Sequence, residues 1–223
     1  MLSDYEKSEK SLKACIDLNA TKNATNYAYK RFLQFGYDKS FNDLKITEAG
    51  NIRFHFQKMS ESDMQLYVNS REEAFQQINE FFNCELPKKI DLFVWDSRDD
   101  AKKILRADLG FADPNYCVIH SYFKQTRGHE ITHVISNYLA KNMVKTGLIN
   151  EGTSVCFDLS NQDKESFVTE WIKKHDEKIN IKDIWSNWEK YPDDLSYPLS
   201  GTFVKLMIDT FGKEEFLEFF VDQ

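Results

Sequence analysis

The segment from His129 to His133 constrains the fold most strongly, because it reads His-Glu-Ile-Thr-His and places two histidines four positions apart. On an α-helix, residues at i and i+4 lie on one face, so both imidazoles can bind the same metal ion. Glu130 lies beside His129 and can polarise a metal-bound water. Catalytic zinc takes three protein ligands and keeps one open position, and Glu151, 18 positions after His133, is the natural third ligand. These four residues predict a zinc hydrolase with Glu130 as general base and one Zn²⁺ per chain.

The residues around the motif indicate a buried amphipathic helix. A polar stretch precedes the motif, and apolar residues follow it at helical spacing. These apolar residues are Val134, Ile135, Tyr138, Leu139 and Met143. The alternative is a surface helix with two solvated histidines. Burying this motif without a metal would leave imidazole edges unpaired, which is energetically costly.

Composition and charge narrow the classes of function. The chain has 223 residues and a net charge of −7, without a basic stripe of the kind that binds nucleic acid. It contains no apolar run long enough to span a membrane. Its four cysteines, which lack metal-site spacing, are expected to be buried thiols: Cys15, Cys84, Cys117 and Cys156. The polar N-terminal residues lack an apolar signal core, which favours a cytoplasmic location, although a trimmed secreted chain would look the same.

The pattern along the chain predicts an α+β fold with a small mixed sheet and an all-helical C-terminal half. Strands are expected at 45–47, 52–57, 90–95 and 116–123. Helices are expected at 3–18, 23–35, 61–83, from about 97 to 110, and at 126–145, 150–160, 164–177, 181–190, 197–211 and 213–221. We divide the chain into an N-terminal helical segment, 1–40, and a domain at 41–223. That domain has a sheet-containing half, 41–125, and a helical half, 126–223.

In this order of elements, three stretches resemble the gluzincin clan of metallopeptidases, which includes thermolysin-like, aminopeptidase-N-like and small peptidase MA-like domains. They are GHEITHVIS at 128–136, LINEGTSVCFD at 148–158, and YPLSGTFVKLMIDTFGKEEF at 197–216. With the preceding strands, the resemblance covers roughly residues 45–221 and leaves residues 1–40 outside. It implies a zincin-like fold and a peptide or protein substrate.

The resemblance also assigns roles to individual residues. His129, His133 and Glu151 match the family's zinc ligands, and Glu130 matches its general base. Tyr197 matches a tyrosine that donates a hydrogen bond to the oxyanion. Residues 116–123 would form the edge strand that pairs with an extended substrate.

The chain departs from the family pattern in several places. It lacks the Gly-x-Met-Glu-Asn run by which aminopeptidases hold a free amine, which favours an endopeptidase. Position 155 is Val, where thermolysin-type enzymes have a carboxylate that orients a ligand histidine. Asp158 could replace that carboxylate or be an ordinary exposed helix residue. His120 could contact the substrate or be a polar residue of the edge strand.

The leading hypothesis is therefore a zinc-dependent endopeptidase. Glu130 would accept a proton from the attacking water and return it to the leaving amine. The alternative is a non-catalytic peptide- or protein-binding module on a zincin-like fold. A purely structural zinc site fits poorly, because such sites close the fourth position, usually with Cys, and no fourth ligand is in register.

Overall fold

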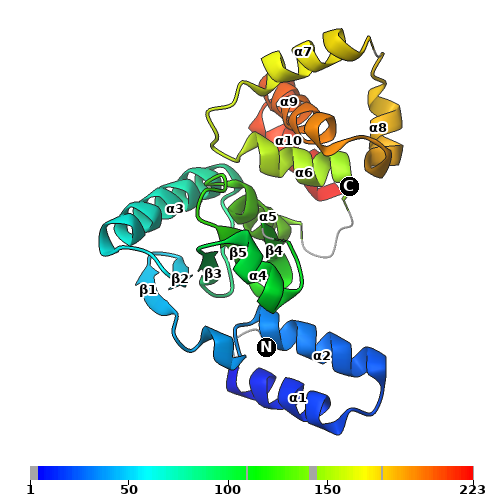
Figure 1. Ribbon diagram of the computed structural model, residues 1–223. Helices are drawn as coiled ribbons and strands as arrows, with labels where there is room; N and C mark the ends of the chain where they lie inside the picture. The colour runs from blue at the N-terminus through cyan, green and yellow to red at the C-terminus, as the bar shows by residue number, and fades with distance from the viewer. Residues whose placement is uncertain (1–4, 109, 141–144, 177, 223) are drawn as a thin grey trace. The chain divides into compact units, whose positions relative to one another are not determined.

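The computed structural model describes residues 5–108, 110–140, 145–176 and 178–222. The chain is α+β, as predicted, and it divides into two compact units (Figure 1). The sheet unit consists of Met1–Glu72 and Leu86–Gln125. The helical unit consists of Glu73–Glu85 and Thr126–Gln223.

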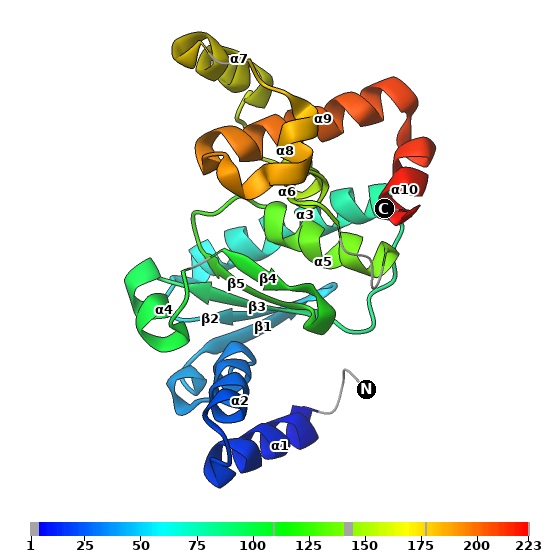
Figure 2. The same ribbon diagram turned by 90° about the vertical axis from the view of Figure 1, so that its right-hand side faces the viewer.

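The sheet unit contains one mixed sheet with the strand order β1-β2-β3-β5-β4 (Figure 2). Strands β2, β3 and β5 are parallel to one another, and the outer strands β1 and β4 pair antiparallel. The strands are β1 (Lys45–Ala49), β2 (Ile52–Phe56), β3 (Ile90–Trp95), β4 (Phe111–Asp113) and β5 (Val118–Tyr122). The helices are α1 (Tyr5–Leu18), α2 (Lys22–Gln34), the short η1 (Lys39–Phe41) and η2 (Pro114–Tyr116), α4 (Arg98–Leu105), and the first part of α3 (Glu61–Phe82).

Strand β3 is buried along its whole length, as expected for a strand that is covered on both faces. On one face, Phe93 and Trp95 pack with Leu33 of α2 and Leu105 of α4. On β2, buried phenylalanines alternate with half-buried polar residues, as predicted. The ring of Tyr67, in the first part of α3, packs on two of these phenylalanines. Helices on both sides of the sheet therefore complete this core.

The N-terminal helices pack within the sheet unit. Tyr5 of α1 donates a hydrogen bond of 2.6 Å to Asp91 of β3, a buried carboxylate that also contacts His55 and Lys88. Burial acts to raise the pKa of Asp91, but the hydrogen bonds and the Lys88 charge outweigh burial and hold the pKa well below its usual range. A buried ion-pair network thus attaches α1 to the central strand.

The sheet differs from the prediction at β5. Residues 116–123 were expected to form an edge strand, and this expectation is wrong, because β4 pairs outside β5 through Phe111 and His120. A short helical turn joins the two strands, and Cys117 closes it with left-handed backbone (φ 51°). A strand as short as β4 gives too few residues for an alternating pattern.

The cysteines also differ in part from the expectation. All four are thiols, and no disulfide links the described elements. Cys117 is buried, whereas Cys15, Cys84 and Cys156 are partly exposed.

The helical unit contains the C-terminal part of α3 and six further α-helices among the described residues. They are α5 (His129–Leu139), α6 (Gly147–Cys156), α7 (Lys164–His175), α8 (Ile181–Asn187) with the short η3 (Trp188–Lys190), α9 (Asp193–Phe211) and α10 (Lys213–Asp222). Helix α5 begins at His129 rather than at 126, and α9 begins at Asp193 rather than at 197. The helical positions predicted at 3–4, 109, 141–144 and 177 lie outside the described residues. Within the described part of the chain, no helix is long and apolar enough to cross a membrane.

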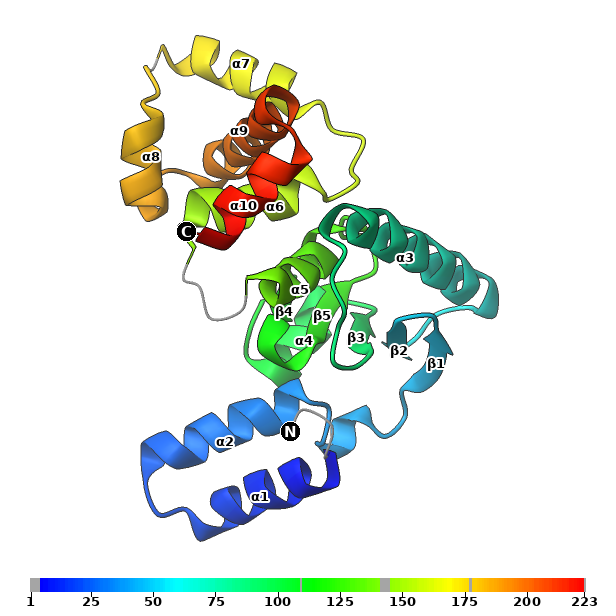
Figure 3. The ribbon, with the colours of Figure 1, turned by 180° about the vertical axis from the view of Figure 1, so that it is seen from behind.

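Helices α6 and α9 pack closely, and α10 lies beside α9 (Figure 3). A Cβ atom on Gly152 of α6 would lie 2.7 Å from the carbonyl oxygen of Ser200 in α9. A Cβ atom on Gly201 of α9 would overlap the side chain of Val155. Glycine at both positions lets the two helices approach within direct backbone contact, and this fixes the position of Tyr197 on α9 relative to Glu151 on α6.

Candidate metal centre

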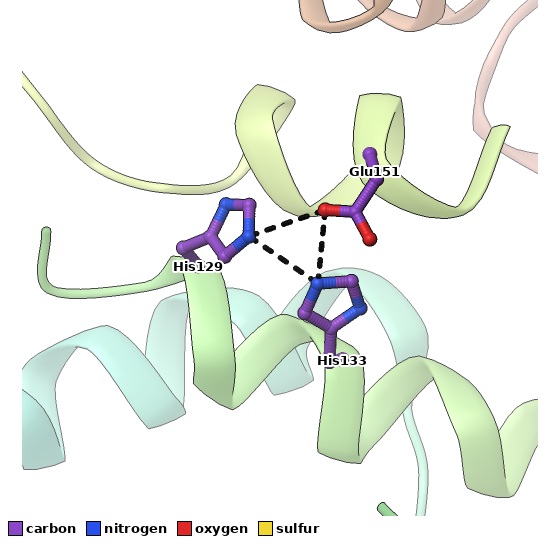
Figure 4. Close-up of side chains that lie close together, drawn as sticks. All are labelled: His129, His133 and Glu151. Carbon is purple, nitrogen blue, oxygen red and sulfur yellow. Dashed lines mark hydrogen bonds and ion pairs between the residues drawn. The ribbon is translucent and has the colours of Figure 1, made fainter. Parts of the chain in front are cut away.

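Two imidazole nitrogens and one carboxylate oxygen converge in the helical unit (Figure 4). The Nε2 atoms of His129 and His133 lie 3.3 Å apart. Oε2 of Glu151 lies 3.4 Å from Nε2 of His129 and 3.3 Å from Nε2 of His133. Both histidines come from α5 and Glu151 comes from α6. The structure thus brings together the three residues that the sequence predicted as ligands.

The size of this triangle matches a tetrahedral metal site. Zinc bonds of about 2.0–2.1 Å to nitrogen and oxygen place neighbouring ligand atoms about 3.3–3.4 Å apart in a tetrahedron. The three measured separations lie in that range. Neutral imidazole nitrogens and a carboxylate oxygen are also a donor set that zinc accepts. The residues therefore fit Zn²⁺ in both geometry and chemistry.

The start of α5 at His129 depends on Gly128. This residue is the N-cap of α5, and any Cβ atom there would overlap the carbonyl oxygen of Phe157. The hydroxyl of Thr132 donates a hydrogen bond of 2.9 Å to the Gly128 carbonyl oxygen, which also accepts the backbone N–H of Thr132. His129 and Glu130 consequently occupy the first turn of the helix, where the helix dipole favours a carboxylate.

A backbone hydrogen bond couples the two ligand-bearing helices. The N–H of Gly128, just before His129, donates to the carbonyl oxygen of Asp158, just beyond the end of α6. The distance is 3.0 Å. The first turn of α5 is thereby held against the segment that follows α6, so the histidines and Glu151 have a defined separation.

The side chain of Asp158 has a different partner from the one anticipated. It is buried, and its Oδ1 accepts hydrogen bonds from the Ser160 N–H at 2.8 Å and from Lys164 Nζ at 2.9 Å. The carboxylate therefore forms an ion pair with Lys164 and a hydrogen bond within the turn that follows α6. It is neither an exposed helix residue nor a group seen to orient a ligand histidine. The reason is that α6 ends at Cys156, so Asp158 does not continue the helical face of Glu151.

The two glutamates of the site have opposite electrostatic environments. Burial raises the pKa of Glu130 to about 7, with His129 opposing this shift and the charge of Glu151 adding to it. Burial also acts to raise the pKa of Glu151, but its contacts with the two histidines outweigh burial and lower the pKa to about 2. Glu151 is therefore ionised at neutral pH, whereas burial makes Glu130 a weaker acid than an ordinary glutamate.

Tyr197 lies beside His129, one of the three candidate ligand residues. Its ring centroid is 6.2 Å from that of His129 and 5.5 Å from that of Trp188. Burial raises the pKa of Tyr197 to about 12, and the negative charges of Glu151, Asp193 and Glu130 add to the shift. The phenol therefore stays protonated at neutral pH and can donate a hydrogen bond. Tyr197 lies in the second turn of α9 and does not open the helix, because Pro192 is the N-cap.

Some neighbours of the site were not identified from the sequence. Nδ2 of Asn150 lies 3.5 Å from Oε1 of Glu151, whereas the histidines contact Oε2. Trp188 packs edge-on against Tyr197. Val155 packs against Gly201 in the contact between α6 and α9. Only the adjacency of Asn150 to Glu151 gave a signal in the sequence, since the contacts of Trp188 depend on how the helices pack.

His120 lies in the core of the sheet unit, so it is neither a substrate contact nor a polar residue of an edge strand, the two alternatives that the sequence offered. Its ring is fully buried and stacks on Phe93 at 4.5 Å. Trp95 Nε1 donates to Nδ1 at 3.0 Å, and Nε2 donates to the Gln34 carbonyl oxygen at 2.8 Å. Both ring nitrogens are therefore satisfied by the protein, and burial lowers the pKa of His120 to about 4.

The chain was also compared with known proteins. No protein-family model matches the sequence, and a search of curated proteins finds no match. What the site can do must therefore be argued from the geometry of α5, α6 and α9.

Proposed function

We propose that this protein is a zinc-dependent peptide hydrolase of the gluzincin type, with a zincin-like fold and endopeptidase activity. The observation that supports this proposal best is the triangle formed by the ligand atoms of His129, His133 and Glu151, whose edges of 3.3–3.4 Å suit tetrahedral zinc. Among the described residues, no fourth His, Cys, Asp or Glu joins this group. A fourth position left to water or substrate is typical of a catalytic site rather than a structural one.

When bound, Zn²⁺ would supply Lewis acidity and lower the pKa of a coordinated water towards neutrality. His129, His133 and Glu151 would hold the ion, and the anionic carboxylate would partly offset its charge. Glu130, in the first turn of α5, accepts the proton of the attacking water and passes it to the leaving amine.

Tyr197 supplies a hydrogen-bond donor for the oxyanion that forms when water adds to the peptide carbonyl. Its protonated phenol, on α9 beside His129, suits this role. The close contact of α6 and α9 through Gly152 holds this donor in place relative to Glu151. Residues of α5, α6 and α9, all in the helical unit, would thus form the active site together.

The proposal is tested by measuring zinc content and hydrolysis of a quenched fluorescent peptide library side by side. We expect about one zinc per chain in the native protein. Glu130→Gln should keep the zinc and lose at least about 100-fold in kcat/KM, because it removes the proton acceptor. His133→Ala should lose both zinc and activity. Tyr197→Phe should keep the zinc and reduce kcat by about 10- to 100-fold.

Glu170→Gln is the matched control, since it makes the same chemical change at an exposed position on α7. Near-full activity of Glu130→Gln would show that Glu130 is not the general base. A native protein that binds zinc but cleaves no member of the library would favour the peptide-binding module on the same fold. A native protein with no bound zinc, and no tight zinc uptake at neutral pH, would rule out the peptidase.

A further inference from the structure

A cavity of about 580 Å³ lies in the sheet unit, which does not contain the metal ligands. Three of its lining residues follow the parallel strands: Lys58 two positions after β2, Asp96 directly after β3 and Phe123 directly after β5. The first part of α3 forms another wall. Open sheets that contain parallel strands commonly bind ligands outside the carboxyl ends of those strands. The volume is also within the usual range for small-molecule sites.

Arg71 of α3 lines this cavity and is only 5% exposed. Its guanidinium donates to the Gln125 carbonyl oxygen at 2.9 Å and to Ser70 Oγ at 3.2 Å. It also lies 4.1 Å from the ring centroid of Tyr67. All of these partners are neutral, and within the described ranges no carboxylate forms an ion pair with Arg71. A buried arginine is seldom left without an anionic partner, and the fork of N–H groups fits a carboxylate well.

Tyr67 adds a second unsatisfied group to the same wall. It is 7% exposed, and its hydroxyl is buried without a hydrogen-bond partner among the described residues. A buried hydroxyl in this state costs free energy, which a polar group that reached it would lower. The cavity therefore combines a buried cation and a buried hydroxyl that the protein itself leaves incompletely paired.

The remaining lining residues suit an apolar body next to the anionic group. Met59, Leu66 and Phe123 contribute apolar surface, and Lys58 contributes an exposed second cation. Two aspartates also line the cavity, but both are exposed, and Asp63 accepts a hydrogen bond of 2.6 Å from Ser60 at the start of α3. The buried part of the lining is thus cationic.

We infer that this cavity binds a carboxylate attached to an apolar group, with Arg71 as its ion-pair partner. The inference goes beyond the proposed peptidase activity and does not depend on it, because no metal ligand lines the cavity. The carboxylate could belong to a small organic acid or to the C-terminus of a peptide, and the recognition chemistry is the same for both.

Binding is tested by ¹H–¹⁵N NMR titration with N-acetyl-phenylalanine and with its C-terminal amide, which has the same shape but no charge. We expect the acid to give saturable shifts at the amides of Tyr67, Arg71 and Phe123, and to bind at least about tenfold more tightly than the amide. Equal affinity for the acid and the amide would overturn the inference. So would the absence of binding of either compound at about 10 mM, since a dissociation constant above this corresponds to very weak binding. Inorganic phosphate binding as tightly as the acid would overturn the carboxylate assignment.

Two sets of variants locate the site. Arg71→Lys should weaken binding of the acid and Arg71→Gln should abolish its preference over the amide, whereas Arg98→Gln, at an exposed arginine of the same unit, should change neither. The acid-to-amide ratio in the native chain decides the question even if the Arg71 variants fail to fold. The same shifts must persist in His133→Ala, and their loss there would place the ligand at the metal centre instead.

The source of the carboxylate is resolved by comparing N-acetyl-phenylalanine with acetylated tripeptides that end in phenylalanine. Tighter binding of the tripeptide would support the C-terminus of a peptide as the occupant. Equal binding would support a small organic acid.

Discussion

At the scale of single residues, the histidines of this chain occupy two contrasting environments. His120 is fully buried, and both of its ring nitrogens have protein partners. His129 and His133 instead direct Nε2 atoms at each other and at an ionised carboxylate. The first arrangement is satisfied without a ligand, whereas the second places three electron-pair donors around one point. This contrast separates a core histidine from candidate metal ligands.

The burial of His120 predicts a pH dependence of stability. The pKa of His120 is about 4 in the folded protein and about 6.5 in the unfolded chain. Burial lowers the folded pKa, the hydrogen bond to Gln34 opposes this shift, and the charge of His55 adds to it. The unfolded chain therefore binds the proton more strongly. The contribution of neutral His120 to the free energy of unfolding is therefore complete above pH 6.5. As the pH falls towards 4, the free energy of unfolding should decrease by on the order of 3 kcal/mol.

This loss is measured as the difference between the native chain and His120→Gln, by urea unfolding at several pH values between about 4 and 7 with a chelator present. The comparison is needed because Glu130, whose folded pKa is raised to about 7, titrates in the same range with the opposite sign. His120→Gln is the control, because it removes the titrating group while keeping hydrogen-bonding capacity. Its free energy of unfolding should fall less than that of the native chain as the pH decreases over this range. The carboxyl group of Asp91 titrates below this range, because its folded pKa is depressed. Identical slopes in the two proteins would show that His120 is not the group responsible.

At the scale of elements, close approach between helices decides where the candidate site residues lie. Gly128 lets the start of α5 meet the segment after α6, and Gly152 lets α6 meet α9. Both glycines adjoin a site residue, His129 in one case and Glu151 in the other. A larger side chain at either glycine would therefore push the helices apart and displace the adjacent proposed ligand.

Gly152→Ala tests this coupling. The new methyl group would lie 2.7 Å from the Ser200 carbonyl oxygen, so α6 must shift away from α9. We expect a loss of about 1–3 kcal/mol in the free energy of unfolding, despite the better helix propensity of alanine, and weaker zinc binding. Thr169→Ala, at an exposed position of α7, should change neither quantity. Urea unfolding measures the stability, and zinc titration measures the affinity. Unchanged zinc affinity in a destabilised Gly152→Ala protein would show that the packing of α6 on α9 does not set the position of Glu151.

At the scale of the whole molecule, the three proposed ligands all belong to the helical unit. A metal that binds only the folded chain stabilises it by about 4 kcal/mol when its free concentration is a thousand times Kd. Zinc should therefore raise the thermal midpoint, and a chelator should lower it again.

Hydrogen exchange locates this effect. Added zinc should slow amide exchange most strongly in α5 and α6, and His133→Ala should show neither the slower exchange nor the higher midpoint. Equal protection of both units by zinc, or protection that persists in His133→Ala, would mean that the metal binds elsewhere.

Much of the fold was predictable because local patterns carry it. Helical spacing predicted α3, α7 and α10 close to their observed bounds, and alternation predicted β2. The spacing of His129 and His133 places both on one helical face, whatever else the chain does. Other features, such as the three-residue strand β4, have no pattern long enough to detect.

What the sequence alone determined about this protein is its α+β character and the two histidines that share one helical face, since both follow from periodicity within single elements. Only the tertiary structure decided that Glu151 on a second helix comes within 3.4 Å of both histidines, that Asp158 pairs with Lys164, and that His120 is enclosed in the sheet core. Each of these depends on contacts between residues distant in the chain. Such contacts are set by packing and by paired buried polar groups, for which a single sequence contains no local signal.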